Sequence, residues 1–197
     1  MLTGNEIINR YNSGQIVISP FSYNNVNPNS YNLTIGSELE IYVDSQETKK
    51  DIETGVIPID DLYRIKFPVV LDPKKENITA KIKIPEEGMI LKPFELYLAK
   101  TNEYTETHNS IPFLNGRSSI GRLGTFIHCT AGFGDIGFKG NWTLELIPIK
   151  PFRIYPNLPI CQICYYEPTG SSALKYSGKY QNDREISKSR LYKEFSK

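Results

Sequence analysis

Apolar and polar residues alternate along most of this chain with a period of two. This pattern is typical of β-strands that bury one face. It predicts strands at 15–18, 30–36, 38–43, 63–71, 78–84 and 95–101, and again at 125–131, 141–149, 151–156 and 159–167. Pro, Gly, Asn or Asp interrupts the pattern between strands, as at Pro28-Asn29 and Glu87-Gly88. Many short strands with few helices favour a barrel or a sandwich.

The first residues instead predict a short helix. Thr3 can cap its N-terminus, and Glu6, three residues on, can reach back to the N–H of the cap and complete a capping box. Leu2 and Ile7 have the spacing of a hydrophobic staple, and Gly14 follows the expected end of the helix.

Two later stretches depart from the strand pattern. Residues 115–124 predict a short helix near 118–123, with Ser118 and Ser119 as candidate caps of its N-terminus. Residues 177–197 are polar and charged, so they bury too little apolar surface to order themselves. We expect this tail to be either disordered or ordered by something that it covers.

Composition supports a mainly β, cytoplasmic protein. The 197 residues include 13 Tyr and 9 Phe, which pack well on a pleated sheet, and they fit one domain without a compositional break. A net charge of +1 argues against a nucleic-acid-binding face. No stretch approaches the roughly 20 apolar residues of a membrane span, and the N-terminus lacks the apolar core of a signal peptide. Three cysteines, an odd number, indicate a reducing compartment.

The segment GRSSIGR at 116–122 has the chemistry of an anion site. Its two serines stand at an expected helix N-terminus, where free N–H groups attract negative charge. Arg117 and Arg122 flank them with guanidinium groups suited to phosphate oxygens. The alternative is a capped surface helix with two solvated arginines, and this segment alone does not decide between them.

A second candidate is the glycine-rich segment at 131–146. Gly132, Gly134, Gly137 and Gly140 would let the backbone approach a ligand closely, and Asp135 lies among them. Glu145 follows on an apolar strand, where it shares a face with Thr143 and opposes Leu144. Glu145 is therefore either an ordinary outward-facing side chain or a site carboxylate with a raised pKa.

Cys161 and Cys164 match the C-x-x-C spacing of metal and redox pairs. They lie within an expected strand, where residues three apart point to opposite faces. There is no second pair, and the chain has only two histidines, His108 and His128, whereas a structural zinc site needs four ligands. We interpret both cysteines as sheet packing. The zinc deaminase signature is absent, as are phosphate-loop, dinucleotide-binding and nucleophile-elbow motifs.

Taken together, several segments resemble the dCTP deaminase family, which is related to trimeric dUTPases. They are VNPNSYNLTIG at 26–36, GRSSIGRLG at 116–124, TAGFGDIGFKGNWTLEL at 130–146, ICQICYYEPTG at 160–170, and GKYQ with SRLYKEF in the tail. The resemblance implies a distorted β-barrel, jelly-roll-like fold of the dUTPase type, spanning 1–197 as a single domain with 177–197 as a mobile lid. It also implies a homotrimer whose active sites lie between subunits.

The resemblance assigns roles residue by residue. The implied catalytic residues are Glu145, Ser118 and Arg122. The implied nucleotide contacts are Arg117, Ser118, Ser119, Arg122, Ala131, Asp135, Thr143, Leu144, Glu145, Gln162, Tyr176 and Lys179. Gly132 and Phe133 resemble the bifunctional members, where strictly deaminating members tend to carry a bulkier His-Arg pair.

The implied reaction is zinc-independent hydrolysis of dCTP to dUTP and ammonia, continuing in bifunctional members to dUMP and pyrophosphate for thymidylate synthesis. Glu145 would activate the water and shuttle its proton, if its pKa is tuned toward neutrality, while Ser118 and Arg122 hold the water. Mg²⁺ would accompany the triphosphate, with no protein metal site, and dTTP is a candidate feedback inhibitor. The alternatives are a plain dUTP pyrophosphatase and a non-catalytic nucleotide-binding regulator.

Three positions depart from the family pattern. Asn32 stands where Asp is usual, and Ile136 stands where Pro is common. Asp183 replaces a usual glutamine near the phosphates, where its charge would repel a triphosphate unless Mg²⁺ or a lysine intervenes.

Overall fold

The computed structural model describes residues 1–58, 69–170 and 174–195. Its strands are β1 (Ile16–Ser19), β2 (Tyr31–Val43), β3 (Ile78–Lys83), β4 (Met89–Leu91), β5 (Tyr97–Thr107), β6 (Ile111–Gly116), β7 (Thr125–Phe126), β8 (Lys139–Pro148), β9 (Phe152–Ile154) and β10 (Pro159–Tyr166). Its helices are α1 (Gly4–Asn12), α2 (Gln46–Glu53) and α3 (Ser118–Arg122), with 3₁₀ turns η1 (Tyr23–Asn25) and η3 (Leu191–Glu194).

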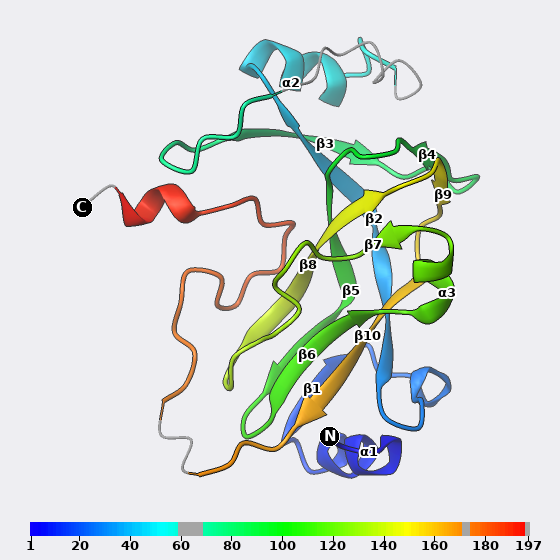
Figure 1. Cartoon of the computed structure of the whole chain (residues 1–197), viewed down its shortest axis with the longest axis vertical. Helices are drawn as coiled ribbons and strands as arrows, with labels where there is room; N and C mark the ends of the chain where they lie inside the picture. Colours follow the sequence, from blue (N-terminus) through cyan, green and yellow to red (C-terminus); the bar gives the residue numbers. More distant parts are fainter. Residues whose placement is uncertain (59–68, 171–173, 196–197) are drawn as a thin grey trace.

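Among the described residues, an eight-stranded sheet forms the body of the protein. Its strands follow the order β6-β10-β2-β5-β8-β7, with β1 also paired to β5 and β3 also paired to β2. β4 and β9 form a separate two-stranded sheet, and all the named strand pairs are antiparallel. The strands wrap around a shared core and give a barrel-like body (Figure 1). The mainly β, barrel-like fold expected from the sequence is confirmed.

β2 joins two parts of this body. Its first half pairs with β10 and its second half pairs with β3, so the separate strands predicted at 30–36 and 38–43 are one continuous element. Gly36 and Ser37 lie at a register shift against β5, between Ile35 and Leu39. A β-bulge of this kind disturbs the alternation without ending the strand, which explains the split prediction.

Other predictions need correction. The strand expected over 125–131 ends at Phe126 as β7, and the rest is loop. The sequence pattern did not reveal α2, β4 or β6. The strand expected over 63–71 falls mostly on residues 59–68, which lie outside the described residues.

α1 forms largely as its sequence predicts. The Thr3 hydroxyl accepts the backbone N–H of Glu6 at 3.3 Å, and Leu2 and Ile7 are both buried in the core. The second half of the expected capping box is wrong, because the Glu6 carboxylate turns to Arg10 instead, with Nε to Oε1 at 2.8 Å. This ion pair joins residues one helical turn apart, is partly buried, and supports the helix.

The core lies between the strands. β2 and β8 supply alternate apolar side chains to it, including Leu33, Ile35 and Leu144, all with no exposed surface. Cys161 is fully buried and Cys164 is nearly so, and both are free thiols on β10. The expectation that these two cysteines serve sheet packing is therefore confirmed.

Candidate active site

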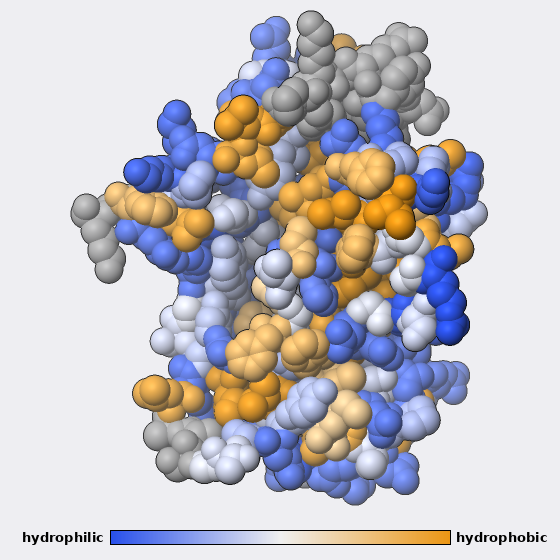
Figure 2. All heavy atoms as spheres, viewed as in Figure 1, coloured by the Kyte–Doolittle hydropathy of each residue, from blue (hydrophilic) through white to orange (hydrophobic). Residues whose placement is uncertain are grey.

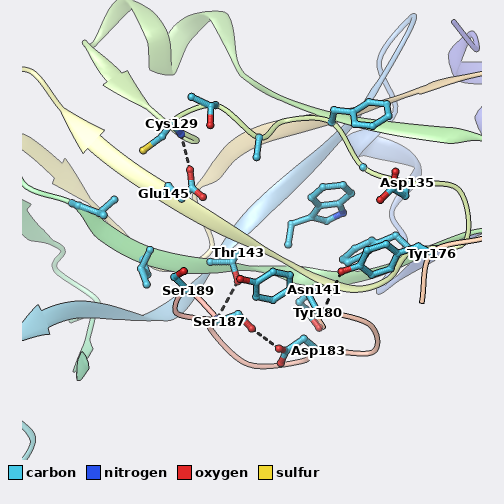
Figure 3. A pocket seen from close by; sticks show the side chains of 18 of the residues that line it. Cys129, Asp135, Asn141, Thr143, Glu145, Tyr176, Tyr180, Asp183, Ser187 and Ser189 are labelled. Atoms are coloured by element: carbon cyan, nitrogen blue, oxygen red, sulfur yellow. Dashed lines mark hydrogen bonds between the residues drawn. The ribbon is translucent and has the colours of Figure 1, made fainter. Parts of the chain in front are cut away.

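A pocket of about 520 Å³ opens beside β8. Side chains of β8, of the loop at 129–138 and of the C-terminal segment, by which we mean residues 174–195, line it (Figure 3). Tyr42 of β2 and Leu96 and Leu98, at the start of β5, complete the lining. Pockets of this volume, with mixed apolar and polar walls, are the usual size for small-molecule sites.

The alternation of β8 decides which side chains face this pocket. Leu144 and Leu146 have no exposed surface and pack into the core, whereas Asn141, Thr143 and Glu145 line the pocket. The prediction that Glu145 shares a face with Thr143 is confirmed, and this face is a concave site. The Leu144 side chain is turned away from it, so Leu144 could contact a nucleotide only through its backbone.

A backbone hydrogen bond holds the Glu145 carboxylate in place. Its Oε2 accepts the N–H of Cys129 at 2.7 Å (Figure 3). A hydrogen bond to an ionised oxygen is among the stronger ones in proteins, so it orients the carboxylate well. Burial raises the pKa of the Cys129 thiol, and the neighbouring Glu145 charge raises it further. The site therefore presents a fixed carboxylate next to a neutral thiol.

Trp142 forms the floor between β8 and the loop. Its indole Nε1 donates to the Thr105 hydroxyl at 2.9 Å, which fixes the ring plane. The Phe138 ring lies 4.8 Å from the Trp142 ring, centroid to centroid, and the Tyr176 ring lies 5.9 Å from Phe138. The Phe138 ring is tilted by 49° to the Trp142 ring and by 59° to the Tyr176 ring, so the three side chains give the pocket an angled aromatic wall, against which a planar ring or a sugar can pack.

Two glycines of the loop are closely packed by the protein itself. A Cβ on Gly132 would come within 2.5 Å of the Leu114 carbonyl oxygen and 2.7 Å of His128 Nε2. A Cβ on Gly134 would come within 2.5 Å of the Trp142 ring. Close packing within the protein therefore requires a small residue at both positions, and the close approach of a ligand to this loop stays a prediction. The exposed loop residues Ala131, Phe133 and Asp135 do line the pocket.

The C-terminal segment is ordered against the body of its own chain. The Asn182 N–H donates to the Lys139 carbonyl at 2.8 Å, and the Asn141 N–H donates to the Asp183 carbonyl at 2.9 Å. Ile186 is buried in a small apolar cluster of its own beside β2 and β5. Of the two alternatives for the tail, the described part follows the second one: it is ordered by what it covers.

Of the two predicted tail contacts, only one faces the pocket. Tyr176 lines it, whereas Lys179 lies outside it, paired with the Glu194 carboxylate near the ring of Tyr180. Tyr180 itself lines the pocket and accepts the Arg190 N–H at 3.0 Å through its hydroxyl.

Asp183 also lines the pocket, and its charge is balanced locally. Its Oδ2 accepts hydrogen bonds from the Arg190 guanidinium and from the Ser187 hydroxyl. Burial alone would raise the pKa of Asp183, but these two partners and the Glu185 backbone N–H outweigh burial and lower it. The paired Arg190 guanidinium therefore reduces the repulsion expected between the Asp183 carboxylate and a triphosphate.

The arginine-serine segment does not reach this pocket within one chain. α3 lies on the opposite side of the body from the C-terminal segment (Figure 1), and neither its serines nor its arginines line the pocket. Ser118, Ser119 and Arg122 are exposed. Arg117 is the N-cap residue and donates from Nη1 to the Pro159 carbonyl at 2.9 Å. The expectation that Ser118 or Ser119 caps the helix is wrong, because both lie inside its first turn.

Gln162 and Asn32 likewise lie away from the pocket, paired across β10 and β2. The Gln162 Oε1 accepts the Ser30 hydroxyl at 3.0 Å, and the Asn32 Oδ1 accepts the Asn27 side-chain amide at 2.9 Å. Asn32, one of the departures from the family pattern, therefore has a neutral amide partner that suits it.

Sequence reasoning missed several residues of the site. Asn141 could have been found, because it continues the alternation of Thr143 and Glu145 toward the start of β8. Tyr180 and Ser187 carry no periodic signal, since they reach the pocket only through long-range contacts of the C-terminal segment.

Within residues 1–58, 69–170 and 174–195, no group of three or more His, Cys, Asp and Glu side chains could hold a metal ion. None of the helices in those ranges is long and apolar enough to cross a membrane.

Comparisons with known proteins agree with this geometry. A family model described as dCTP deaminase-like matches residues 1–168. Proteins named "dCTP deaminase, dUMP-forming" are 49% identical over 195 residues in Hathewaya histolytica, covering 99% of both chains, and 47% identical over 197 residues in Leptospira biflexa, covering 100% of this chain and 99% of that one.

A solved structure has a similar fold. The crystal structure of 2′-deoxycytidine 5′-triphosphate deaminase from Agrobacterium tumefaciens matches 85% of this chain with a TM-score of 0.57 and 18% identity. The present chain spans 48% of that chain's length. The family model and the full-length relatives together establish that this chain belongs to the dCTP deaminase-like family.

Proposed function

We propose that this protein hydrolyses dCTP to dUMP, ammonia and pyrophosphate. The observation that carries the proposal is the Glu145 carboxylate, fixed by the Cys129 N–H on the wall of a nucleoside-sized pocket. The names of relatives that match the whole chain, "dCTP deaminase, dUMP-forming", supply the substrate and the product.

The proposed chemistry at the base needs one carboxylate that works twice. Glu145 takes a proton from a water molecule, whose oxygen then attacks C4 of cytosine, and returns that proton to N3. Glu145 then moves the proton of the new C4 hydroxyl to the exocyclic nitrogen, the bond from C4 to that nitrogen breaks and releases ammonia, and the C4 carbonyl of uracil forms. Thr143, on the same face of β8, is positioned beside Glu145 to contact the ring.

We further propose that the active unit is a homotrimer, because α3 lies away from the pocket of its own chain. Ser118 and Arg122 of a neighbouring copy would then hold the water and stabilise the developing charge. Exposed apolar side chains beside α3 support a subunit contact there: Leu123 is 59% exposed and Phe126 is 59% exposed. Figure 2 shows apolar atoms gathered on the face around β7 and β9.

The second half of the reaction concerns the triphosphate, which binds as its Mg²⁺ complex. The C-terminal segment, including Lys179, would close over it and exclude water from the base. Gly132 supports the dUMP-forming assignment, since the packing around it leaves no room for the bulkier side chain of strictly deaminating members. The product would supply thymidylate synthesis in the cytoplasm, with dTTP as a feedback inhibitor, and the free state of the three cysteines fits that compartment.

A time course of products tests this proposal. Purified protein is incubated with Mg²⁺ and either dCTP or dUTP, and the nucleotides are separated by chromatography. We expect dUMP and pyrophosphate from dCTP. Accumulation of dUTP from dCTP would overturn the dUMP-forming half alone. Turnover of dUTP without any change in dCTP would mean a plain dUTP pyrophosphatase, and nucleotide-dependent thermal stabilisation without turnover would mean a regulatory relative.

A further inference from the structure

A series of hydrogen bonds links the C-terminal segment to Thr143, which lines the pocket. It begins at Arg190, whose guanidinium pairs with the Asp183 carboxylate. The same carboxylate oxygen accepts the Ser187 hydroxyl, and the Ser187 backbone N–H donates to the Thr143 hydroxyl oxygen at 3.1 Å (Figure 3). Thr143, Ser187 and Asp183 all line the pocket.

In this series of contacts, Asp183 is well placed to hold Ser187 in position. The Asp183 side chain is 15% exposed and the Arg190 side chain is 31% exposed, so their pair is partly shielded from water. The backbone of Asp183 is also fixed, because its carbonyl oxygen accepts the Asn141 N–H near the start of β8. An anchor held by both backbone and charge limits the positions that Ser187 can take.

The Thr143 end determines what the pocket offers to a ligand. A threonine hydroxyl has one hydrogen to donate and lone pairs that accept. The Thr143 oxygen accepts the Ser187 N–H, so the hydrogen of the same hydroxyl is left to donate to a different acceptor. Within the described part of the chain no acceptor is seen for it, and Thr143 faces the pocket. A pyrimidine ring carries such acceptors at its carbonyl oxygen and at its unprotonated ring nitrogen.

We propose that Asp183 is a positioning residue, which acts through Ser187 to set the Thr143 hydroxyl as a hydrogen-bond donor to the pyrimidine. The C-terminal segment thereby prepares the base site of its own chain, in addition to covering the pocket. This inference rests on the proposed turnover of dCTP.

A double-mutant cycle on kcat/KM for dCTP tests the proposal. Asp183→Ala should lower kcat/KM by about tenfold, and Thr143→Val, which keeps the shape but removes the hydroxyl, should lower it at least as much. If Asp183 acts through Thr143, adding Asp183→Ala to Thr143→Val should cause no further loss. A merely structural role of Asp183 would instead make the two losses multiply, and that result would overturn the inference.

Glu185→Gln is the matched control. It removes another acid of the same segment, whose side chain pairs with Lys100 and Lys81 and is 68% exposed. We expect kcat/KM within about twofold of the unmodified protein, because such exposed pairs contribute little. A tenfold loss in Glu185→Gln would show that any acid of the segment matters, which would contradict a specific role for Asp183.

Folding and function are kept apart by two further measurements. Melting temperatures report whether each variant folds, and if Asp183→Ala does not, Ser187→Ala takes its place in the same cycle. Ser187→Ala should lower kcat/KM in the unmodified protein but cause no further loss when it is added to Thr143→Val. If the two losses in kcat/KM multiply, the proposal is again refuted. If the unmodified protein leaves dCTP unchanged, the proposed function fails and this inference fails with it. If dCTP is consumed but the losses multiply, only the inference fails.

Discussion

Replacing Glu145 with glutamine should lower kcat for dCTP by about a thousandfold or more, while nucleotide affinity stays within about tenfold. Glutamine keeps the shape of the side chain, and its carbonyl oxygen can still accept the Cys129 N–H that now binds Oε2 at 2.7 Å. It cannot carry a proton between water and the base. Single-turnover rates and equilibrium binding of dCTP, measured on the same preparation, separate the two effects.

Glu106→Gln provides a matched control for this variant. Glu106 is also a glutamate on a central strand, but it pairs with Tyr104 and Lys139 and does not line the pocket. Its replacement should leave kcat within about twofold of the unmodified protein, since the change lies outside the site. Near-normal turnover in Glu145→Gln would refute the role that we assign to Glu145.

If the proposed homotrimer is the active unit, assemblies that mix two impaired variants should regain activity that each variant lacks alone. Arg122→Ala is expected to lower turnover about a hundredfold, because in the proposed mechanism Arg122 stabilises the charge that develops in the transition state. If each site combines Glu145 of one chain with α3 of another, then random mixing of Arg122→Ala and Glu145→Gln chains leaves about a quarter of the sites intact. Activity after the two variants are unfolded together and refolded, compared with each variant refolded alone, measures this recovery.

A second mixture shows whether recovery depends on the shared site. Glu145→Gln chains mixed with Glu145→Ala chains lack the carboxylate in every site, so no activity should return. Native mass spectrometry confirms that mixed assemblies form. If Arg122→Ala and Glu145→Gln chains assemble together without regaining turnover, or if the assembly is not a trimer, then α3 does not complete the pocket of a neighbour.

Local patterns in the sequence predicted the parts of the site that lie on regular elements. On β8, alternation alone placed Thr143 and Glu145 on one face and Leu144 on the other, as the structure has them. Strand geometry has a period of two whatever its surroundings, so this inference needed no knowledge of the rest of the chain. The capped start of α1 was equally predictable, because the Thr3 cap and the Glu6 N–H are only three residues apart.

Contacts between distant residues were not predictable in this way. Ser187 reaches Thr143 across 44 positions of sequence, and no periodic pattern marks it. For the same reason the sequence did not reveal that Gly134 of the glycine-rich loop packs against the Trp142 ring. The sequence pattern did not predict α2, because this helix is mostly polar and Ile52 is its buried residue. It therefore lacks the broad apolar face that marks most surface helices.

The most direct test of the proposed reaction is to follow the oxygen that enters the base. The protein hydrolyses dCTP in water enriched in ¹⁸O, the phosphate is removed from the product, and the mass of the resulting nucleoside is measured by mass spectrometry. We predict dUMP that carries one ¹⁸O in its uracil ring at C4, with ammonia formed in equal amount. Recovery of unchanged dCTP, while dUTP added to the same protein is cleaved to dUMP whose uracil ring is unlabelled, would contradict the account.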